Sequence, residues 1–382
     1  MRDCHREITK WLIAAGADVG VDAAGNIRGF YGGAQSSAPR LLLGSHLDTV
    51  PNAGAFDGIL GVVIAVALVE SLENRRLPFA IEIVGFSEEE GVRFGTPFIG
   101  SRALVGRLDA ELLNRQDSNG VSVRTAIKNF GLNPEEIPRA ALADDTLAYL
   151  EFHIEQGPVL ESLGRPLGVV EAIAAQTRME FAFLGRANHA GTTPMHLRHD
   201  AIAAAAEWIV AVERTANSQP GLVATVGQIE ANPGATNVIA AEARATLDVR
   251  HKSDEICGAA ANTLLRLACE IAERRGLSLR QNVLLSQRAV TMDPFLVHQV
   301  EEAIRGTGCQ PHRMTSGAGH DAMILAEKVP AAMVFLRSPG GISHDPAESV
   351  EVEDVGKALE CGLHLLDQLA SSSEFQKRMC RA

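Results

Sequence analysis

Short apolar runs separated by helix-like segments characterise the first 176 residues of the chain. Residues 40–44, 79–86 and 148–153 are apolar runs of the length expected for buried strands. Between the first two, residues 58–75 are rich in Val, Ala and Leu and are long enough to form a helix. Buried strands that alternate with helices predict an α/β fold with a mostly parallel sheet, in which ligands bind beyond the carboxyl ends of the strands.

A different pattern begins near residue 177. Met179, Phe181 and Phe183 recur at every second position, and from 241 to 249 the odd-numbered positions are apolar while the even-numbered ones are polar. This alternation predicts strands with one buried and one exposed face. Helix-like segments at residues 199–216 and 253–275 follow these strands. The resulting order, strand–helix–strand–strand–helix–strand, predicts a small α+β, ferredoxin-like sheet.

The alternation of helix and strand returns after about residue 287, with residues 331–336 as a strand and residues 352–369 as a helix. We therefore expect a discontinuous catalytic domain made of residues 1–176 and 288–382. Residues 177–287 would be inserted in it as a second domain.

Charge and composition narrow the classes of partner. The 382 residues carry a formal net charge of −12 and contain no block of Lys and Arg, which argues against nucleic acid and anionic membrane as partners. The longest apolar run, residues 59–69, is about half as long as a bilayer span, and the first ten residues are charged. None of the six cysteines forms a CxxC pair, so neither a disulfide framework nor a thiolate zinc site is indicated. We expect a cytoplasmic protein with reduced thiols.

Polar residues follow the first two buried strands. His46 stands in GSHLDTV, where Asp48 can hold the second ring nitrogen, and Asp57 stands in AFDG just before the expected helix. By itself Asp57 would be interpreted as a helix N-cap. Glu89 and Glu90 belong to SEEEG after the next strand, where a run of carboxylates would repel without a cation. One of them can bind a metal while its neighbour serves as a general base.

Two further histidines occur in similar contexts, His153 in FHIEQG and His344 in GGISHDPAE. A single histidine of this kind is more often structural. The joint pattern of histidine and carboxylate without cysteine instead suits a hydrolytic site for divalent cations.

Nine motifs together resemble one family. They are GSHLDTV, AFDG, SEEEG, FHIEQGPVLE, GRANHAGTTPM, GATNV, LDVRH, SGAGHDAM and GGISHDPAE, and they extend in the family's order over residues 44–348. The chain resembles the M20 metallopeptidase-like superfamily and, within it, the hydantoinase/carbamoylase branch. The resemblance implies an amidohydrolase that cleaves the ureido (N-carbamoyl) group of allantoate or of an N-carbamoyl-L-amino acid and releases ammonia and carbon dioxide.

The resemblance also assigns a cofactor, two divalent ions that can be zinc, manganese, cobalt or nickel. It implies that Asp57 bridges the two ions. His46 and His153 would complete one site, and Glu90 and His344 would complete the other.

Near the ligands, the resemblance implies one catalytic carboxylate and two supporting residues. Glu89 would be the general base that takes the proton from the attacking water. Glu88 would have a supporting role at most, and His320 would lie behind the ligands or cap a helix.

Substrate recognition is expected in and near the inserted domain. By resemblance, His189 reaches the active site of a neighbouring subunit and stabilises the oxyanion, which would give a homodimer a functional role. Arg250 would bind the substrate carboxylate with Asn237 beside it, and Gln176 would lie near the substrate. Gly341 would let the backbone approach the substrate. Composition alone leaves Arg250 as an exposed or salt-bridged arginine and His189 as part of a surface turn.

Two alternatives remain. A peptidase or aminoacylase of the same superfamily is disfavoured, because His153 stands where its peptidases usually carry a carboxylate. A non-catalytic scaffold should have lost a ligand or the base, yet all five ligand positions and Glu89 are present.

Overall fold

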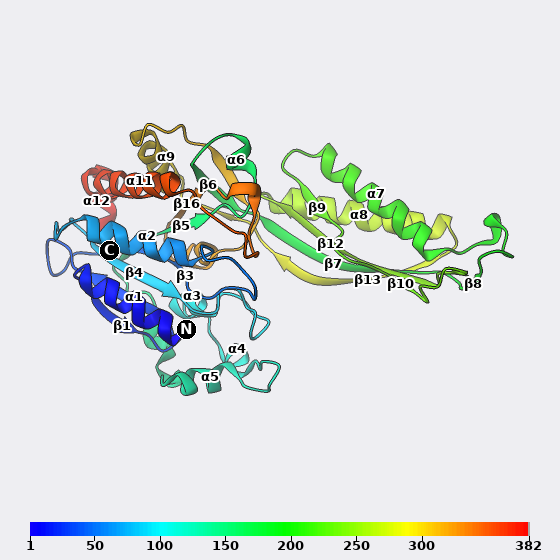
Figure 1. Ribbon diagram of the computed structural model, residues 1–382, viewed down its shortest axis with the longest axis horizontal. Coiled ribbons are helices and arrows are strands. Elements are labelled where there is room, and N and C mark those ends of the chain that lie inside the picture. Colours follow the sequence, from blue (N-terminus) through cyan, green and yellow to red (C-terminus); the bar gives the residue numbers. More distant parts are fainter. Residues whose placement is uncertain (381–382) are drawn as a thin grey trace. The chain divides into compact units, whose positions relative to one another are not determined.

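The computed structural model describes residues 1–380, which form two compact units (Figure 1). Among these described residues, the first unit consists of residues 1–171 and 292–380, and the second of Ala172–Thr291. Among the described residues, no helix combines the length and the apolar character that a bilayer crossing requires. The six cysteines are free.

The first sheet has the strand order β1-β2-β4-β3-β5-β16-β6-β14, and β15 also pairs with β6. Its four middle strands, β4, β3, β5 and β16, run parallel to one another, and antiparallel strands flank them. This arrangement confirms the predicted α/β fold with a mostly parallel central sheet. The strands are β1 (Asp18–Val21), β2 (Ile27–Tyr31), β3 (Arg40–His46), β4 (Ala80–Phe86), β5 (Thr146–Ile154), β6 (Leu167–Ile173), β14 (Val290–Thr291), β15 (Arg313–Ser316) and β16 (Ala331–Leu336).

The apolar runs of the sequence form the centre of this sheet. Every residue of β4, β5 and β16 is buried, because helices and loops cover both faces of a parallel sheet. Two carboxylates within these strands are buried with partners. Glu82 pairs with Arg28 and Arg40, and Glu151 accepts a hydrogen bond from the Ser45 hydroxyl at 3.0 Å.

Helices surround the first sheet. α2 packs against β3, β4 and β5, while α9 and α11 pack against each other and against β16. The α-helices of this unit are α1 (Arg2–Ala14), α2 (Ile59–Ser71), α3 (Ile99–Leu104), α4 (Ala110–Asn114), α5 (Val123–Phe130), α6 (Val159–Ser162), α9 (Pro294–Gly306), α10 (Asp321–Leu325), α11 (Val352–Ser371) and α12 (Ser373–Met379). The 3₁₀ segments are η1 (Pro134–Ala140) and η3 (Pro339–Gly341).

The second unit is an antiparallel sheet with two helices on one face (Figure 1). Its strand order is β10-β12-β7-β13, with β9 paired to β12, and β8 and β11 form a separate two-stranded ribbon. The buried positions of β7 and β12 pack on Trp208 of α7, which lies 4.5 Å from the ring of Phe181. The elements are β7 (Ala175–Leu184), β8 (Asn188–His189), η2 (Met195–Leu197), α7 (Ala201–Ser218), β9 (Val223–Thr225), β10 (Ile229–Asn232), β11 (Val238–Ile239), β12 (Glu242–His251), α8 (Asp254–Arg274) and β13 (Ser278–Gln287).

Candidate active site

Four neighbouring parallel strands end at one edge of the first sheet, and candidate ligands lie at those ends or in the segments that follow them. His46 is the last residue of β3, and His153 is the last but one of β5. Glu90 comes four residues after β4 ends, and His344 lies in the segment after β16. Because the carboxyl ends of parallel strands meet at the same edge, side chains far apart in the sequence gather in one place.

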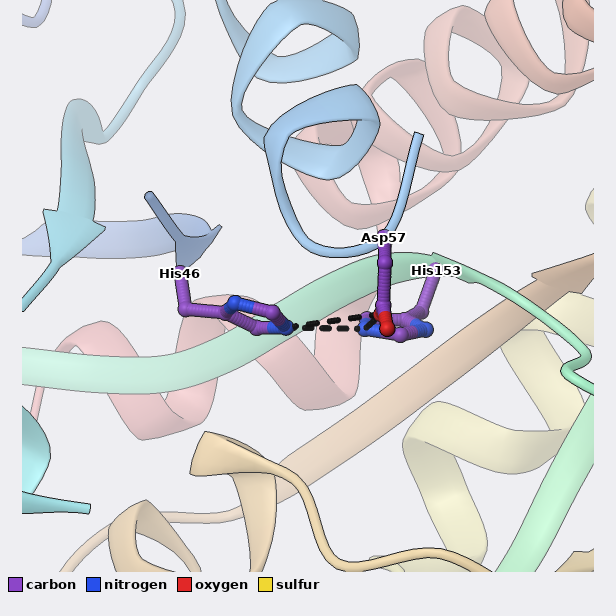
Figure 2. Close-up of side chains that lie close together, drawn as sticks. All are labelled: His46, Asp57 and His153. Carbon is purple, nitrogen blue, oxygen red and sulfur yellow. Dashed lines mark hydrogen bonds and ion pairs between the residues drawn. The ribbon is translucent and has the colours of Figure 1, made fainter. Parts of the chain in front are cut away.

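Two groups of side chains with metal-ligand chemistry share Asp57. One group is His46, Asp57 and His153, and the other is Asp57, Glu90 and His344. Within each group the potential ligand atoms lie within 4.8 Å of one another. Asp57 Oδ1 lies 3.6 Å from His46 Nε2 and 3.2 Å from His153 Nε2 (Figure 2). Its other oxygen, Oδ2, lies 3.0 Å from His344 Nε2, so one carboxylate faces both groups.

The charges and the hydrogen bonding of this cluster fit divalent cations. Asp57 Oδ1 and Glu90 Oε1 are buried atoms with no hydrogen-bond partner of normal geometry. Burying such an oxygen without a partner is costly, and a cation bound there would remove the cost. Burial acts to raise the pKa of Asp57, but the imidazoles of His153 and His46 outweigh it and hold that pKa well below its usual range. Imidazole and carboxylate ligands without thiolate suit zinc, manganese, cobalt or nickel.

Glu89 lies beside both groups. Its carboxylate is within 4.8 Å of the ligand atoms of His46 and Glu90, and Glu89 is only 6% exposed. Burial raises the pKa of Glu89 well above its usual range, against the opposing effect of His46. A carboxylate with a raised pKa suits proton transfer near neutral pH. Because Glu90 also meets Asp57 and His344, the geometry favours Glu90 as the ligand and Glu89 as the base.

Backbone carbonyls orient the two buried imidazoles. His46 Nδ1 lies 2.8 Å from the backbone oxygen of Asp48, and His153 Nδ1 lies 2.9 Å from that of Ile154, so each Nε2 faces the cluster. The contact from Asp48 to the second ring nitrogen is made by its backbone oxygen, whereas its carboxylate is 4.0 Å from that nitrogen. That carboxylate accepts hydrogen bonds from the backbone N–H groups of Glu89 and Glu90, both at 3.0 Å. Asp48 therefore orders the loop after β4 as well as His46.

The chain bends sharply where it carries these side chains. Glu88, Gln156 and His344 have left-handed backbones with φ of 55°, 57° and 58°. Such strain in non-glycine residues is concentrated at functional sites. Glu88 carries a further carboxylate, and burial together with nearby Asp48 raises its pKa to about 7. α2 begins after Gly58 in the N-cap position, so capping of this helix does not account for Asp57.

His320 lies behind His153, with ring centroids 4.5 Å apart, and its Nε2 is 2.8 Å from the hydroxyl of Ser316. With Glu151 these two histidines form another group of metal-ligand type. Both oxygens of Glu151 already accept hydrogen bonds, from Ser45 Oγ and from the backbone N–H of Ala322, each at 3.0 Å. Because both oxygens of Glu151 have donors, this group is a weaker candidate for a metal site than the two groups that share Asp57.

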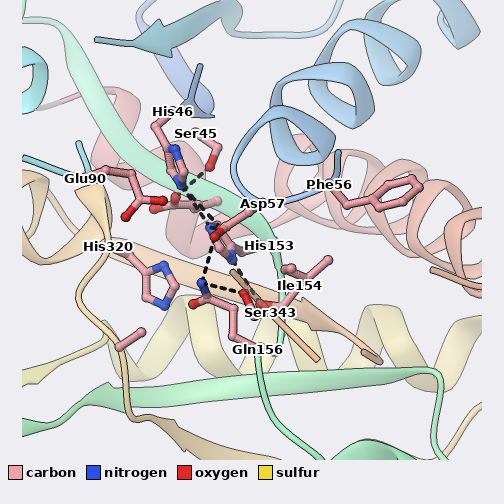
Figure 3. A network of polar contacts seen from close by, with 12 residues as sticks. Ser45, His46, Phe56, Asp57, Glu90, His153, Ile154, Gln156, His320 and Ser343 are labelled. Carbon is pink, nitrogen blue, oxygen red and sulfur yellow. Dashed lines mark hydrogen bonds and ion pairs between the residues drawn. The ribbon is translucent and has the colours of Figure 1, made fainter. Parts of the chain in front are cut away.

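Two residues at this site were not singled out from the sequence. Gln156 Nε2 donates hydrogen bonds to Asp57 Oδ2 at 3.0 Å and to Ser343 Oγ at 3.3 Å (Figure 3). Glu348 Oε1 accepts the backbone N–H groups of Phe56 and Asp57 at 3.0 and 3.1 Å. Both stand inside motifs that also contain a candidate ligand, FHIEQG and GGISHDPAE, and this was the available signal.

Gly341 has a left-handed backbone with φ of 65°. A Cβ at this position would lie 2.9 Å from the backbone nitrogen of Pro158. The close approach of Pro158 to position 341 therefore requires glycine there, independently of any contact with a substrate.

Two of the expected substrate residues, Gln176 and Arg250, are opposite each other in the register of β7 and β12. Both bind Asp248. Arg250 Nε and Nη2 donate to its two oxygens at 2.9 Å each, and Gln176 Nε2 donates to Oδ2 at 2.7 Å. Arg178 Nε also donates to Oδ2, at 2.8 Å. Burial acts to raise the pKa of Asp248, but the guanidiniums of Arg250 and Arg178 lower it to about 2.

The other two expected residues, His189 and Asn237, lie together at the ribbon of β8 and β11. His189 ends β8, and the carbonyl of Asn237, directly before β11, accepts the N–H of Ala190 at 2.9 Å. Within one chain Asn237 is therefore beside His189. Gln176 is at the start of β7 and the ribbon follows its other end, so a strand of about 27 Å separates the two pairs (Figure 1).

Comparison with known proteins now identifies the family. Residues 42–368 match the Peptidase family M20/M25/M40. The chain belongs to this family. It is 39% identical over 366 residues to an N-carbamoyl-L-amino acid amidohydrolase of Geobacillus stearothermophilus, which covers 95% of this chain and 90% of that protein. It is 36% identical over 402 residues to a probable allantoate deiminase of Oryza sativa subsp. japonica, covering 95% of this chain and 81% of the relative.

Solved structures agree with this assignment. A crystal structure of an amidase of the hydantoinase/carbamoylase family from Burkholderia multivorans matches with a TM-score of 0.89 and 32% identity, covering 94% of this chain and 88% of that chain. The resemblance to this branch of the M20 family is confirmed. This M20 family member is an enzyme, a hydrolase that acts on carbon–nitrogen bonds other than peptide bonds.

Proposed function

We propose that this enzyme hydrolyses the ureido group of a small carboxylate-bearing substrate, either allantoate or an N-carbamoyl-L-amino acid, with the help of two divalent cations. The observation that carries the proposal is the position of Asp57 between two groups of histidine and carboxylate side chains. The relatives whose names specify these two substrates support the substrate class.

In this proposal His46, Asp57 and His153 hold one cation, and Asp57, Glu90 and His344 hold the other. When bound, the cations act as Lewis acids that acidify a water molecule and polarise the ureido carbonyl. The side chains fix the positions at which this chemistry occurs, and the buried setting strengthens it.

Glu89 takes the proton from the attacking water and passes it to the leaving nitrogen, so that ammonia departs. Its buried carboxylate beside His46 and Glu90, with a pKa raised by burial, supports this role. The carbamate left behind then decomposes to carbon dioxide and the amine.

Arg250 and Gln176 would bind the substrate carboxylate, and His189 with Asn237 would act on the ureido oxygen. His189 Nδ1 accepts the backbone N–H groups of Gly191 and Thr192, at 3.1 and 3.2 Å, which leaves Nε2 of the neutral ring as a proton donor. Because the strand β7 separates the two pairs, we propose that one subunit supplies Arg250 and its partner supplies His189 in a homodimer formed through the second unit.

Release of ammonia tests the proposed reaction. Metal-free enzyme, with and without added Mn²⁺, is incubated with allantoate, several N-carbamoyl-L-amino acids and N-carbamoyl-β-alanine, with N-acetyl amino acids and dipeptides as comparison substrates. We expect Mn²⁺-dependent release of ammonia from at least one ureido substrate and little hydrolysis of the comparison substrates. Efficient dipeptide cleavage without ureido hydrolysis would overturn the proposal.

The shared site is tested by mixing two inactive variants, Glu89→Gln and His189→Ala. A hybrid dimer would contain one site with both Glu89 and His189, so random exchange of subunits should restore about a quarter of wild-type activity. No recovery, despite hybrids detected by mass spectrometry, would show that His189 does not act across the dimer.

A further inference from the structure

Glu348 is a buried carboxylate in the first unit that none of the catalytic steps above uses. It is 5% exposed, and it belongs to the turn that follows His344. The backbone N–H of Glu348 donates to the carbonyl of Asp345 at 2.9 Å, which returns the chain toward the candidate ligands.

Both oxygens of Glu348 are engaged with segments that carry ligands. Oε1 accepts the backbone N–H groups of Phe56 and Asp57, and Oε2 accepts the hydroxyl of Ser343 at 3.2 Å. Gly54 permits this approach, because a Cβ there would lie 2.3 Å from the Cβ of Glu348. Glu348 thus ties the loop before α2 to the loop that carries His344.

Gln156 closes this connection from a third segment. Its side-chain amide donates both to Asp57 Oδ2 and to Ser343 Oγ (Figure 3). The backbone of Asp57 is held by Glu348, and its side chain is held by Gln156. Ser343, which precedes His344, contacts both.

We propose that Glu348 is a positioning residue that fixes Asp57 and His344 in one geometry. It thereby sets the affinity for the cation that Asp57, Glu90 and His344 would hold. His46 and His153 are oriented independently by backbone carbonyls, so the group that contains them depends less on Glu348. This inference rests on the pair of cations in the proposed function. Hydrogen-bonding partners of metal ligands typically change metal affinity by about 10- to 100-fold when they are lost.

Calorimetric titration of the metal-free 382-residue chain with Mn²⁺ tests this proposal without measuring activity. Wild type should bind two ions. Glu348→Ala should weaken one of the two binding steps by about 10- to 100-fold and leave the other largely unchanged. Glu348→Gln should retain most of the affinity, because its amide oxygen can still accept the N–H groups of Phe56 and Asp57 and its amide nitrogen faces Ser343.

Asp117→Ala is a matched control for stability. Asp117 Oδ1 also accepts two backbone N–H groups, those of Asn119 and Val121, but in a turn that carries no candidate ligand. Loss of the Asp117 carboxylate should lower the unfolding midpoint of the protein without weakening the binding of either Mn²⁺ ion. Two ions bound with unchanged affinity by Glu348→Ala would overturn the role of Glu348 alone, as would a Glu348→Gln variant as weak as Glu348→Ala. A wild-type protein that binds fewer than two ions would overturn the proposed function and this inference together.

Discussion

Replacement of Gly58 by alanine would test how the ring of His46 is held at the candidate metal centre. Gly58 has φ of 70°, and a Cβ built on it would lie 2.4 Å from the Cε1 and Nδ1 atoms of His46. Ordinary contact begins at 3.4 Å, so the ring or the loop must move by about 1 Å. His46 has little room to move, because it is 2% exposed and its Nδ1 is held by the carbonyl of Asp48.

Two effects of Gly58→Ala can be separated by magnitude. The backbone of Gly58, with φ of 70° and ψ of −60°, lies in a region that alanine rarely adopts, and holding alanine there should cost about 1–3 kcal/mol of unfolding free energy. The displacement of the imidazole by about 1 Å should lower kcat/KM by about 100-fold, a typical consequence of such a misplacement. Affinity for the cation held by His46 should fall as well.

Gly120→Ala provides the control. Gly120 has φ of 75°, and a Cβ there would meet nothing within 4 Å. This variant should therefore lose a similar amount of stability in chemical denaturation while it keeps wild-type kcat/KM and Mn²⁺ affinity. If Gly58→Ala also kept wild-type kcat/KM and wild-type Mn²⁺ affinity, the close approach of Gly58 to His46 would have no functional importance. That result would refute the reasoning.

Three further predictions concern the chemistry of the site. Glu89→Gln should still bind two Mn²⁺ ions yet lose turnover by about 10²- to 10⁴-fold in the ammonia assay, and retained turnover would remove Glu89 from the role of base. Arg250→Ala should raise KM for carboxylate substrates by about 10- to 100-fold with a smaller change in kcat, and an unchanged KM would exclude it as the carboxylate-binding group. Burial acts to lower the pKa of both His46 and His153, but Glu89 and Asp57 outweigh it at His46, and Asp57 outweighs it at His153, so that both pKa values lie above the usual range. Since cations bind neutral imidazole, Mn²⁺ affinity should rise with pH through these raised pKa values, and calorimetry in buffers of different ionisation enthalpy should detect released protons. Binding without proton release would contradict this.

Several site residues were found from the sequence and others were not. Ligand candidates such as His46 and Glu90 stand at the end of a buried strand or a few residues after it, so their convergence follows from the parallel pairing of those strands. Gln156 and Glu348 gave no comparable signal, because their partners are backbone N–H groups and side chains of distant loops. The interpretation of Arg250 as a salt-bridged arginine, left open by composition, agrees with its contact to Asp248.

The sequence by itself determined the central strands of both sheets, the helices that pack on them, the resemblance to the family and the identity of the candidate ligands, because apolar periodicity and motif letters are local properties of the chain. Only the tertiary structure decided that the backbone oxygen of Asp48 rather than its carboxylate holds His46, that Gln156 and Glu348 hold Asp57, and that Asn237 lies beside His189 within the second unit. These relations depend on strand order, register and the paths of loops, which bring together atoms whose separation along the chain is unrelated to their distance in space.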